Sequence, residues 1–376
     1  MEYGSVGVMD IRNGMIKSNI PRCLRRAQLN GVSKGGEHPL WSRAGFIPRS
    51  RNAELITALA ILLLASALGH AAEKLRVATG GFSPSVPPYI SFAKPFLLKQ
   101  DIEVEDILMS SGTLSAQTLA SGQVKIIVTT SAVVPQFNIN GGDMVIVAGT
   151  INKLPYQIVA RGEIKTPALL KGKRVAISRF GSSSEWLVRL SLTKMGLDPD
   201  KDVSIIQIGG PSERLAALLN NAVQATLLGP PTSTHAVRTM GMVQLADLTE
   251  SETTYPLQSV ITTRAFVKEN RPLVKRFLRG LGLAFNHYRE RAQDGIAFQM
   301  KQFKLPNDLA EAGYRSSVRV MEPELKPPDN SALDLVVKEL AVRIEKAKTV
   351  TPDELRMVDD SIRVELVKEG IFKSSR

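Results

Sequence analysis

The chain has 376 residues, a formal net charge of +12 and a hydrophobic fraction of 43%. This length exceeds one average domain, and the composition is that of a folded globular protein, which excludes a fibrous or wholly disordered chain. The single cysteine, Cys23, excludes a disulfide framework.

An apolar segment near the start, residues 55–69, is predicted to be a secretory signal. It contains no charged residue, Arg49 and Arg51 precede it, and small residues follow, with cleavage expected after Ala71 or Ala72. A basic flank, a short apolar core and a small-residue exit are typical of such signals. The segment is short for a membrane-spanning helix, which needs about 20 apolar residues. A retained membrane anchor is the alternative.

Residues 1–53 hold nine Lys or Arg against three Asp or Glu and show no periodicity. We interpret them as a disordered basic extension, either an over-long gene start or an extended n-region of the signal. Residues 1–72 are therefore assigned to this extension plus the signal peptide. Their position before an export signal argues against a nucleic-acid-binding arm. Without residues 1–72 the net charge falls to +7, from 39 basic and 32 acidic residues. That excess suits small anions, and we expect no nucleic-acid partner.

From residue 74 onward, short apolar runs alternate with helical patterns. Strands separated by helices form parallel β-α-β units with right-handed crossovers, so we expect an α/β fold. The predicted strands are residues 75–79, 102–109, 124–130 and 144–148, and the predicted helices are residues 88–99, 113–121 and one from Ser131.

A second series repeats this order. Its predicted strands are residues 174–178, 203–208 and 223–228, and its helices are one that Gly181-Ser182-Ser183-Ser184 opens and Gly196 ends, one over 213–220 and one through Arg238. The pattern Thr113-x-x-Ala116-x-x-Leu119-x-x-Gly122-x-Val124 returns as Ser212-x-x-Leu215-x-x-Leu218-x-x-Asn221-x-Val223 at an offset of 99. In each copy a hydroxyl can cap the helix, and Gly or Asn can end it. The repeat predicts two similar α/β lobes.

Two extended segments, residues 153–161 and 255–264, are predicted to cross between the lobes. Two crossings make a hinge, and a cleft between hinged lobes can close on a ligand. The resulting assignment is residues 73–161 and 257–376 to lobe one and residues 162–256 to lobe two.

The end of the chain is predicted to be helical. Apolar residues recur at helical spacing over residues 272–289 and again from Leu333 to Ile344. We expect both stripes to pack against lobe one. A docking surface for a partner protein is the alternative.

Candidate ligand-binding residues follow the predicted strands, because ligands of open α/β sheets bind beyond the carboxyl ends of the strands. The turns there offer hydroxyls and free helix N–H groups, which suit an anionic or polar ligand. They comprise Phe82 and Ser83; Ser111 and Gly112; Thr129, Thr130 and Ser131; Gly181, Ser182 and Ser183; and Gly229. Arg179 could clamp a carboxylate or sulfonate. The alternatives are plain helix caps and, for Arg179, a solvated surface side chain.

Several short motifs together resemble a known family. They are the strand and Gly-Phe turn at residues 75–83, Leu-Ala-Ser-Gly-Gln-Val at 119–124, Leu-Lys-Gly-Lys-Arg-Val at 170–175, Gly-Ser-Ser at 181–183, Met-Gly-Leu at 195–197 and Asp-Val at 202–203. In these the chain is similar, over residues 74–372, to type II periplasmic solute-binding proteins of ABC importers for sulfonates, taurine, nitrate and thiamine-pyrimidine precursors. The resemblance implies two α/β lobes, a ligand cleft between them, and delivery of a small molecule to a membrane permease. One departure is Gln224, where the family usually carries an aspartate.

Catalytic and metal-binding motifs are not evident. His235 and His287 are far apart in the sequence, no cysteine follows the signal, and residues 198–209 lack the Gly and Glu of a calcium loop. No nucleotide-binding glycine pattern or Gly-x-Ser-x-Gly elbow is present. We therefore expect no cofactor, no metal and no catalytic residues.

These observations predict a two-lobed periplasmic-binding-protein type II fold in which helices flank a mostly parallel sheet in each lobe and the C-terminal helices lie on lobe one. We expect a monomeric periplasmic receptor that captures a small anionic organic molecule and delivers it to an ABC importer permease, its only link to the membrane. The main alternative is a membrane-anchored or envelope sensor that uses the same fold. An enzyme on this fold is less favoured.

Overall fold

The computed structural model describes residues 72–81, 83, 84, 86, 89–249, 255–322, 324–342 and 344–372. The predicted basic extension, the predicted signal at residues 55–69 and Phe82 lie outside the described residues. The described part falls within one compact unit, Gly69–Arg376. None of its helices combines the length and apolar character that crossing a membrane requires.

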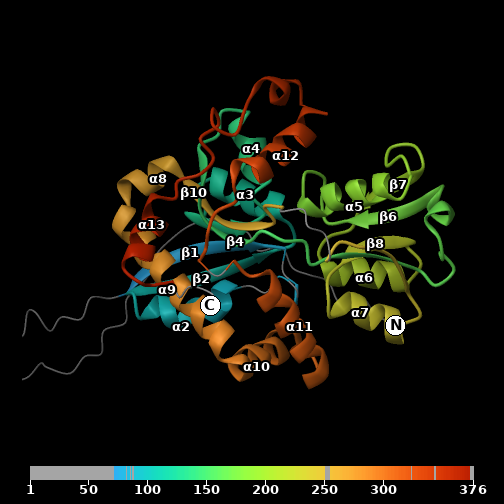
Figure 1. Cartoon of the computed structure of the whole chain (residues 1–376), viewed down its shortest axis with the longest axis horizontal. Helices are drawn as coiled ribbons and strands as arrows, with labels where there is room; N and C mark the ends of the chain where they lie inside the picture. The colour runs from blue at the N-terminus through green and yellow to red at the C-terminus, as the bar shows by residue number, and fades with distance from the viewer. Residues whose placement is uncertain are drawn as a thin grey trace, which may run out of the picture. The chain divides into compact units, whose positions relative to one another are not determined.

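The first sheet has five strands in the order β2-β1-β3-β10-β4. β1 pairs in parallel with β2 and β3, whereas β10 runs antiparallel to both β3 and β4. Its elements are β1 (Glu73–Gly80), α2 (Tyr89–Leu98), β2 (Ile102–Met109), α3 (Gly112–Ala120), β3 (Ile126–Thr129), α4 (Val133–Asn138), β4 (Met144–Ile151) and β10 (Gln258–Thr263). Figure 1 shows this sheet in blue to green, with β10 from much later in the chain.

The second sheet also has five strands, in the order β7-β6-β8-β5-β9. β6 is parallel to β7 and β8, and β5 is antiparallel to β8 and β9. Its elements are β5 (Gln157–Ala160), η1 (Pro167–Leu170), β6 (Lys173–Ile177), α5 (Ser183–Lys194), β7 (Val203–Gln207), α6 (Pro211–Leu219), β8 (Ala225–Leu228), α7 (Thr232–Thr239) and β9 (Val243–Asp247). Both sheets therefore share one strand order with the antiparallel strand in fourth place. This equivalence confirms the predicted fold class.

β5 lies in the second sheet, whereas the predicted boundary at residue 161 had placed it in lobe one. All four residues of β5 are buried, and its pairing with β8 and β9 decides its sheet. A short apolar run is compatible with a buried strand in either sheet, so the sequence could not indicate to which sheet β5 belongs. Apart from this strand, the division of the chain into lobes stays a prediction. β9 was not predicted, because its half-exposed sequence VQLAD lacks a clear apolar run.

The two connections between the sheets run beside each other. The N–H of Tyr255, just before β10, donates to the carbonyl of Asn152, just after β4, at 3.1 Å. The ring of Tyr255 stacks on Trp186 of α5, with 4.2 Å between centroids and 12° between planes. The connections are thus tied to each other and to the first helix of the second lobe.

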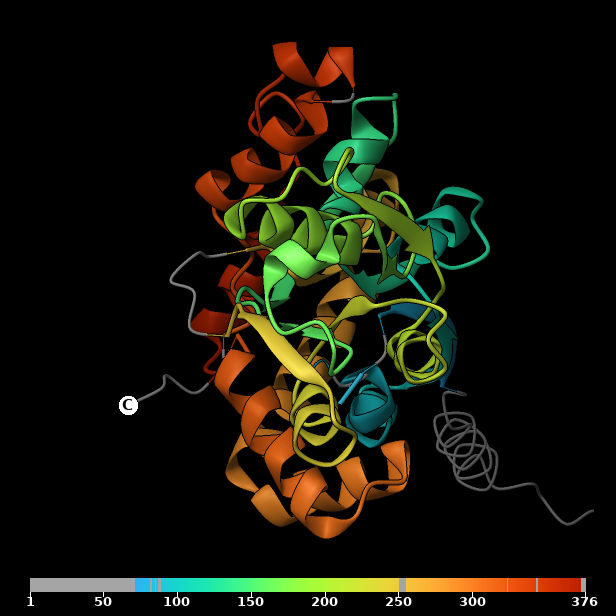
Figure 2. The ribbon, with the colours of Figure 1, turned by 90° about the vertical axis from the view of Figure 1, so that its right-hand side faces the viewer.

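The C-terminal helices pack mainly on the first sheet and its helices. They are α8 (Arg264–Glu269), α9 (Arg271–Glu290), α10 (Ala292–Phe303), α11 (Asn307–Val320), α12 (Asn330–Ala341), η2 (Glu345–Thr349) and α13 (Ser361–Lys368). The predicted apolar stripe of α9 is buried, and α9 packs against α2 and α13. The stripe of α12 packs against α4. In Figures 1 and 2, α10 and α11 lie at the bottom of the view and α12 at the top.

The repeated helix ends adopt the conformation that the sequence repeat predicted. Gly122 after α3 has a φ of +74°, and Asn221 after α6 has a φ of +57°. The predicted caps were wrong by two residues. Ser111 caps α3, accepting a hydrogen bond from Leu114 N at 3.3 Å, whereas Gly210 occupies the N-cap position of α6 and has no side chain to cap it. In both cases the strand-to-helix turn is shorter than the sequence suggested.

Replacing Gly122 by Ala should lower the free energy of unfolding by about 1–2 kcal/mol, the cost of a left-handed residue with a Cβ. No heavy atom lies within 4 Å of the position a Cβ would occupy, so the cost is conformational and not steric. Chemical denaturation measures it. Gly122→Asn is the matched control and should cost less, because Asn221 holds the same conformation in the second lobe. Equal losses for the two variants would contradict this explanation.

Candidate functional site

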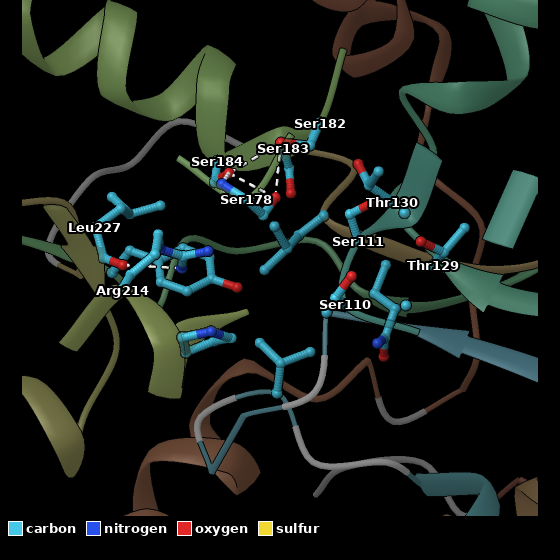
Figure 3. A pocket seen from close by; sticks show the side chains of 18 residues that line it. Ser110, Ser111, Thr129, Thr130, Ser178, Ser182, Ser183, Ser184, Arg214 and Leu227 are labelled. Atoms are coloured by element: carbon cyan, nitrogen blue, oxygen red, sulfur yellow. Dashed lines mark hydrogen bonds between the residues drawn. The ribbon is translucent and has the colours of Figure 1, made fainter. Parts of the chain in front are cut away.

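A pocket lies between the two sheets, at the carboxyl ends of their parallel strands. From the part of the chain around the first sheet it is lined by Gly80, Gly81, Val86, Ser110, Ser111, Gly112, Thr129, Thr130, Leu257 and Gln258. From the part around the second sheet it is lined by Tyr156, Ser178, Ser182, Ser183, Ser184, Pro211, Arg214 and Leu227. Figure 3 shows the labelled hydroxyls around a central space, with Arg214 across it from Ser110 and Ser111.

The cavity is small and rich in hydroxyls. Its volume is about 40 Å³, room for a few water molecules or a small ligand. None of the described lining residues is an aspartate or glutamate, and the cation among them is Arg214. The surroundings therefore favour an oxyanion over a cation.

On the first-sheet side, two glycines let the turns approach each other closely. A Cβ on Gly80 would lie 2.6 Å from Thr129 Oγ1, and a Cβ on Gly112 would lie 2.5 Å from the same atom. Thr129 Oγ1 is buried and has no hydrogen-bond partner within the described part of the chain. Because a buried hydroxyl without a partner is costly, Thr129 is well suited to bind a ligand atom.

On the second-sheet side, a network of serines fixes the turn before α5. The hydroxyls of Ser178, Ser182 and Ser184 lie 2.8–2.9 Å from one another. Ser182 also caps α5, its Oγ accepting from Glu185 N at 3.4 Å. The backbone N–H groups of Ser183 and Ser184, in the first turn of α5, donate to no other described residue. A helix N-terminus with free N–H groups is an anion-binding element.

The backbone N–H of Gly181, in contrast, already donates a hydrogen bond within the protein. It donates to Glu185 Oε2 at 2.7 Å, and Glu185 Oε1 accepts from Arg189 at 3.0 Å. Gly181 faces Gln136 of α4 and lines a neighbouring pocket with Glu185 and Trp186. Only part of the Gly/Ser turn is therefore directed at the candidate site.

Arg214 in the first turn of α6 is the most unusual residue of the pocket. The residue is 3% exposed. Nη1 donates to Gly209 O at 2.8 Å and Nη2 to Leu227 O at 3.1 Å, while Nε is buried without a partner in the described structure. Burial lowers the pKa of Arg214 to about 10, so it stays cationic at neutral pH. A buried cation without a carboxylate partner is costly, and so is a cation near a helix N-terminus.

Tyr156, on the first connection between the sheets, is the aromatic residue among the described lining residues. Burial raises the pKa of Tyr156 to about 12, and the positive charge of Arg214 counteracts part of that rise. The phenol therefore stays protonated at neutral pH and can donate a hydrogen bond into the pocket.

Half of the predicted ligand-binding residues line this pocket. They are Ser111, Gly112, Thr129, Thr130, Ser182 and Ser183. The others are placed elsewhere, except Phe82, which lies outside the described residues. Ser83 Oγ accepts from Val86 N at 3.3 Å, Ser131 Oγ is 2.7 Å from Ser259 Oγ, and Gly229 O accepts from Ser233 N at 3.1 Å. Arg179 is half-buried in the turn after β6 but does not line the pocket.

Sequence reasoning missed Ser110, Tyr156, Ser178, Ser184, Arg214 and Gln258. For Arg214 a signal was available. A basic residue in the first turn of a helix that follows a strand opposes the helix dipole, and such a placement calls for a reason. For Tyr156 and Gln258 no local signal existed, because they reach the pocket from the connecting strands.

Gln224, where the resembling family usually has an aspartate, is a structural residue. Its Oε1 accepts from Arg174 N at 3.1 Å, and its Nε2 donates to Asn221 Oδ1 at 3.0 Å. It thus joins β8 to β6 and to the end of α6, outside the pocket lining.

A model of the NMT1/THI5-like family matches residues 85–291, more than half of the chain. The chain belongs to this family. No curated protein matches the sequence. The resemblance to periplasmic solute-binding proteins found in the sequence is confirmed by this match and by the solved structures of similar fold.

Three solved structures illustrate the likeness. The alkanesulfonate-binding protein SsuA from Xanthomonas axonopodis pv. citri, bound to MOPS, is 20% identical with a TM-score of 0.61, over 73% of this chain and 94% of that one. The periplasmic nitrate-binding protein NrtA from Synechocystis PCC 6803 is 16% identical with a TM-score of 0.62, over 80% and 91%. The periplasmic sulfonate-binding protein SsuA of a sulfonate ABC transporter from Methylobacillus flagellatus KT is 16% identical with a TM-score of 0.56, over 81% and 99%. At these identities the likeness shows the fold.

Replacing Gly112 by Ala should destabilise the protein by about 1–3 kcal/mol, the usual cost of overpacking. The new Cβ would lie 2.5 Å from Thr129 Oγ1 and 2.7 Å from Thr130 Cγ2. Chemical denaturation of Gly112→Ala, Thr129→Ala and the double variant tests the steric origin. The loss in free energy of unfolding caused by Gly112→Ala should be smaller in the Thr129→Ala background. An unchanged loss would disprove the steric origin.

Proposed function

We propose that this protein is an extracytoplasmic solute receptor that captures a small anionic molecule between its two lobes and delivers it to an ABC importer. The observation that carries the proposal is Arg214, a buried guanidinium that faces hydroxyls and free helix N–H groups and has no acidic partner among the described residues.

A ligand oxyanion would supply the partner that Arg214 lacks. Hydrogen bonds between a guanidinium and an oxyanion are among the strongest in proteins, and burial strengthens them further. Additional donors are the N–H groups of Ser183 and Ser184 and the hydroxyl of Tyr156. A group such as a sulfonate, carboxylate or nitrate accepts several hydrogen bonds and so fits this set of donors.

Ligand binding between the two sheets would couple binding to closure. Ser111 and Thr130 reach the pocket from the first sheet, while Ser183 and Arg214 reach it from the second. A ligand that contacts both sides stabilises the arrangement in which the sides are close. The connections at Asn152 and Tyr255 would be the hinge, and a permease would recognise the closed form.

A receptor is favoured over an enzyme by the chemistry of the lining. Its titratable members in the described structure are Arg214, with a pKa of about 10, and Tyr156, with a pKa of about 12. Neither exchanges a proton readily near neutral pH, so the lining offers no acid–base pair suited to catalysis there.

The similar solved structures support a receptor that serves an importer. Two of them are named as sulfonate-binding and one as nitrate-binding, and one is assigned to an ABC transporter. The predicted signal at residues 55–69 agrees with a periplasmic location.

Replacing Arg214 by Gln should abolish most anion binding, with a loss of about 2 kcal/mol or more, on the order of 30-fold in Kd. Isothermal titration with ethanesulfonate, nitrate and acetate gives the Kd of the anion that binds wild type. The matched control is Arg179→Gln, which removes the cation of the α5 turn that does not line the pocket. An equal loss in both variants, or none in Arg214→Gln, argues against this site.

The double change Ser182→Ala and Ser183→Ala should weaken the same binding by about 1 kcal/mol for each hydrogen bond removed. The double change removes the Ser182 side chain that caps α5 and the Ser183 hydroxyl that lines the pocket. Ser191→Ala is the control in the same helix, because Ser191 Oγ donates to Leu187 O at 2.7 Å away from the pocket. A ligand-dependent rise in melting temperature that is identical in wild type and the double variant would remove the α5 turn from the site.

A further inference from the structure

We infer that the pocket selects anions whose remaining part is uncharged and rejects the same anions when they carry an ammonium group. This inference deepens the proposed function and rests on it. It divides the candidate ligands into two classes, simple sulfonates or carboxylates on one side and zwitterionic amino-sulfonates or amino acids on the other.

The described walls of the pocket carry a positive charge. An ammonium group taken from water into a closed pocket is costly unless it is paired with an opposite charge, and neutral hydroxyls do not supply one. The described lining residues include Arg214 but no aspartate or glutamate. In a cavity of about 40 Å³, a ligand ammonium would also lie near the guanidinium, whose like charge disfavours it.

Two carboxylates near the pocket are bound to other partners, and a third, Glu213, acts on Arg214 by its charge but does not line the pocket. Glu185 accepts from Gly181 N and Arg189 and lines the neighbouring pocket. Asp106 accepts from Thr79 Oγ1 at 2.7 Å and from Ser91 Oγ at 2.6 Å. Moving either carboxylate toward a ligand would break hydrogen bonds that hold the fold together.

Part of the remaining pocket lining is apolar. Val86, Leu227 and Leu257 are buried apolar residues that contact the pocket. They suit the methylene groups of an uncharged ligand tail and offer nothing to an ammonium group. Among the described lining residues, Tyr156 is the aromatic ring that could form a cation–π contact, but the charge of Arg214 acts on the same residue.

The test uses two ligands of nearly equal size, 2-hydroxyethanesulfonate and 2-aminoethanesulfonate, titrated into the full chain by calorimetry at pH 7. Hydroxyacetate and glycine form the corresponding carboxylate pair. In the pair that binds, we expect the Kd of the amino compound to be about tenfold or more higher than the Kd of the hydroxy compound. Equal binding within that pair, or tighter binding of the amino compound, overturns the inference and leaves the proposed function intact.

A gain-of-function variant tests the same point from the protein side. Ser110 lines the pocket but is exposed, so an acidic side chain there can be accommodated, and Figure 3 shows it across the space from Arg214. Ser110→Asp should narrow the preference for the hydroxy compound severalfold or reverse it, whereas the neutral Ser110→Asn should preserve it. An identical preference in both variants contradicts the inference. If neither ligand pair nor the simple anions bind to wild type, the proposed function itself fails, and this inference with it.

Discussion

The arrangement of the pocket depends on one buried charge. Arg214 donates to two backbone carbonyls, but these neutral partners do not neutralise its charge, and its Nε has no partner in the described structure. A protein selected for stability alone would gain by replacing such a group with an apolar side chain. Under the proposed function, an anionic ligand supplies the missing negative charge, and the site without ligand costs stability.

The remaining parts of the site hold donors in place around that charge. The serine network fixes the turn before α5, because Ser178, Ser182 and Ser184 constrain one another through short hydrogen bonds. Gly80 and Gly112 allow the turns of the first sheet to meet over Thr129, where any side chain would collide. Donors that are fixed before binding lose little entropy when a ligand arrives, and preorganisation of this kind favours affinity.

The shared strand order of the two sheets explains why these donors face each other. In each sheet the fourth strand is antiparallel and comes from a connection between the lobes, β10 in the first and β5 in the second. The turns after the parallel strands of both sheets therefore open toward the same space, in which Arg214 from one side meets Ser111 and Thr130 from the other. A ligand held by both sides would link the positions of the two sheets to its own presence.

The sequence determined the elements of this protein and the class of its fold. Apolar periodicity located most strands, the α-helices up to α7, and α9 and α12, but not β9, α8, α10, α11 or α13. The repeat at an offset of 99 predicted two similar lobes, because local patterns report local structure. The hydroxyl-bearing turns were found in the same way, and half of the residues predicted there line the pocket. Family membership agrees with the resemblance that the motifs carried.

Only the tertiary structure decided which sheet receives β5 and which cation faces the ligand space. β5 is buried on every residue, so its partners depend on long-range pairing that no local pattern encodes. Arg179 and Arg214 both follow strands, yet α6 directs Arg214 into the pocket, while Arg179 stays in the turn beside it. Burial distinguishes the two cations, because Arg214 is buried whereas Arg179 is half-buried, and burial arises only when distant segments come together.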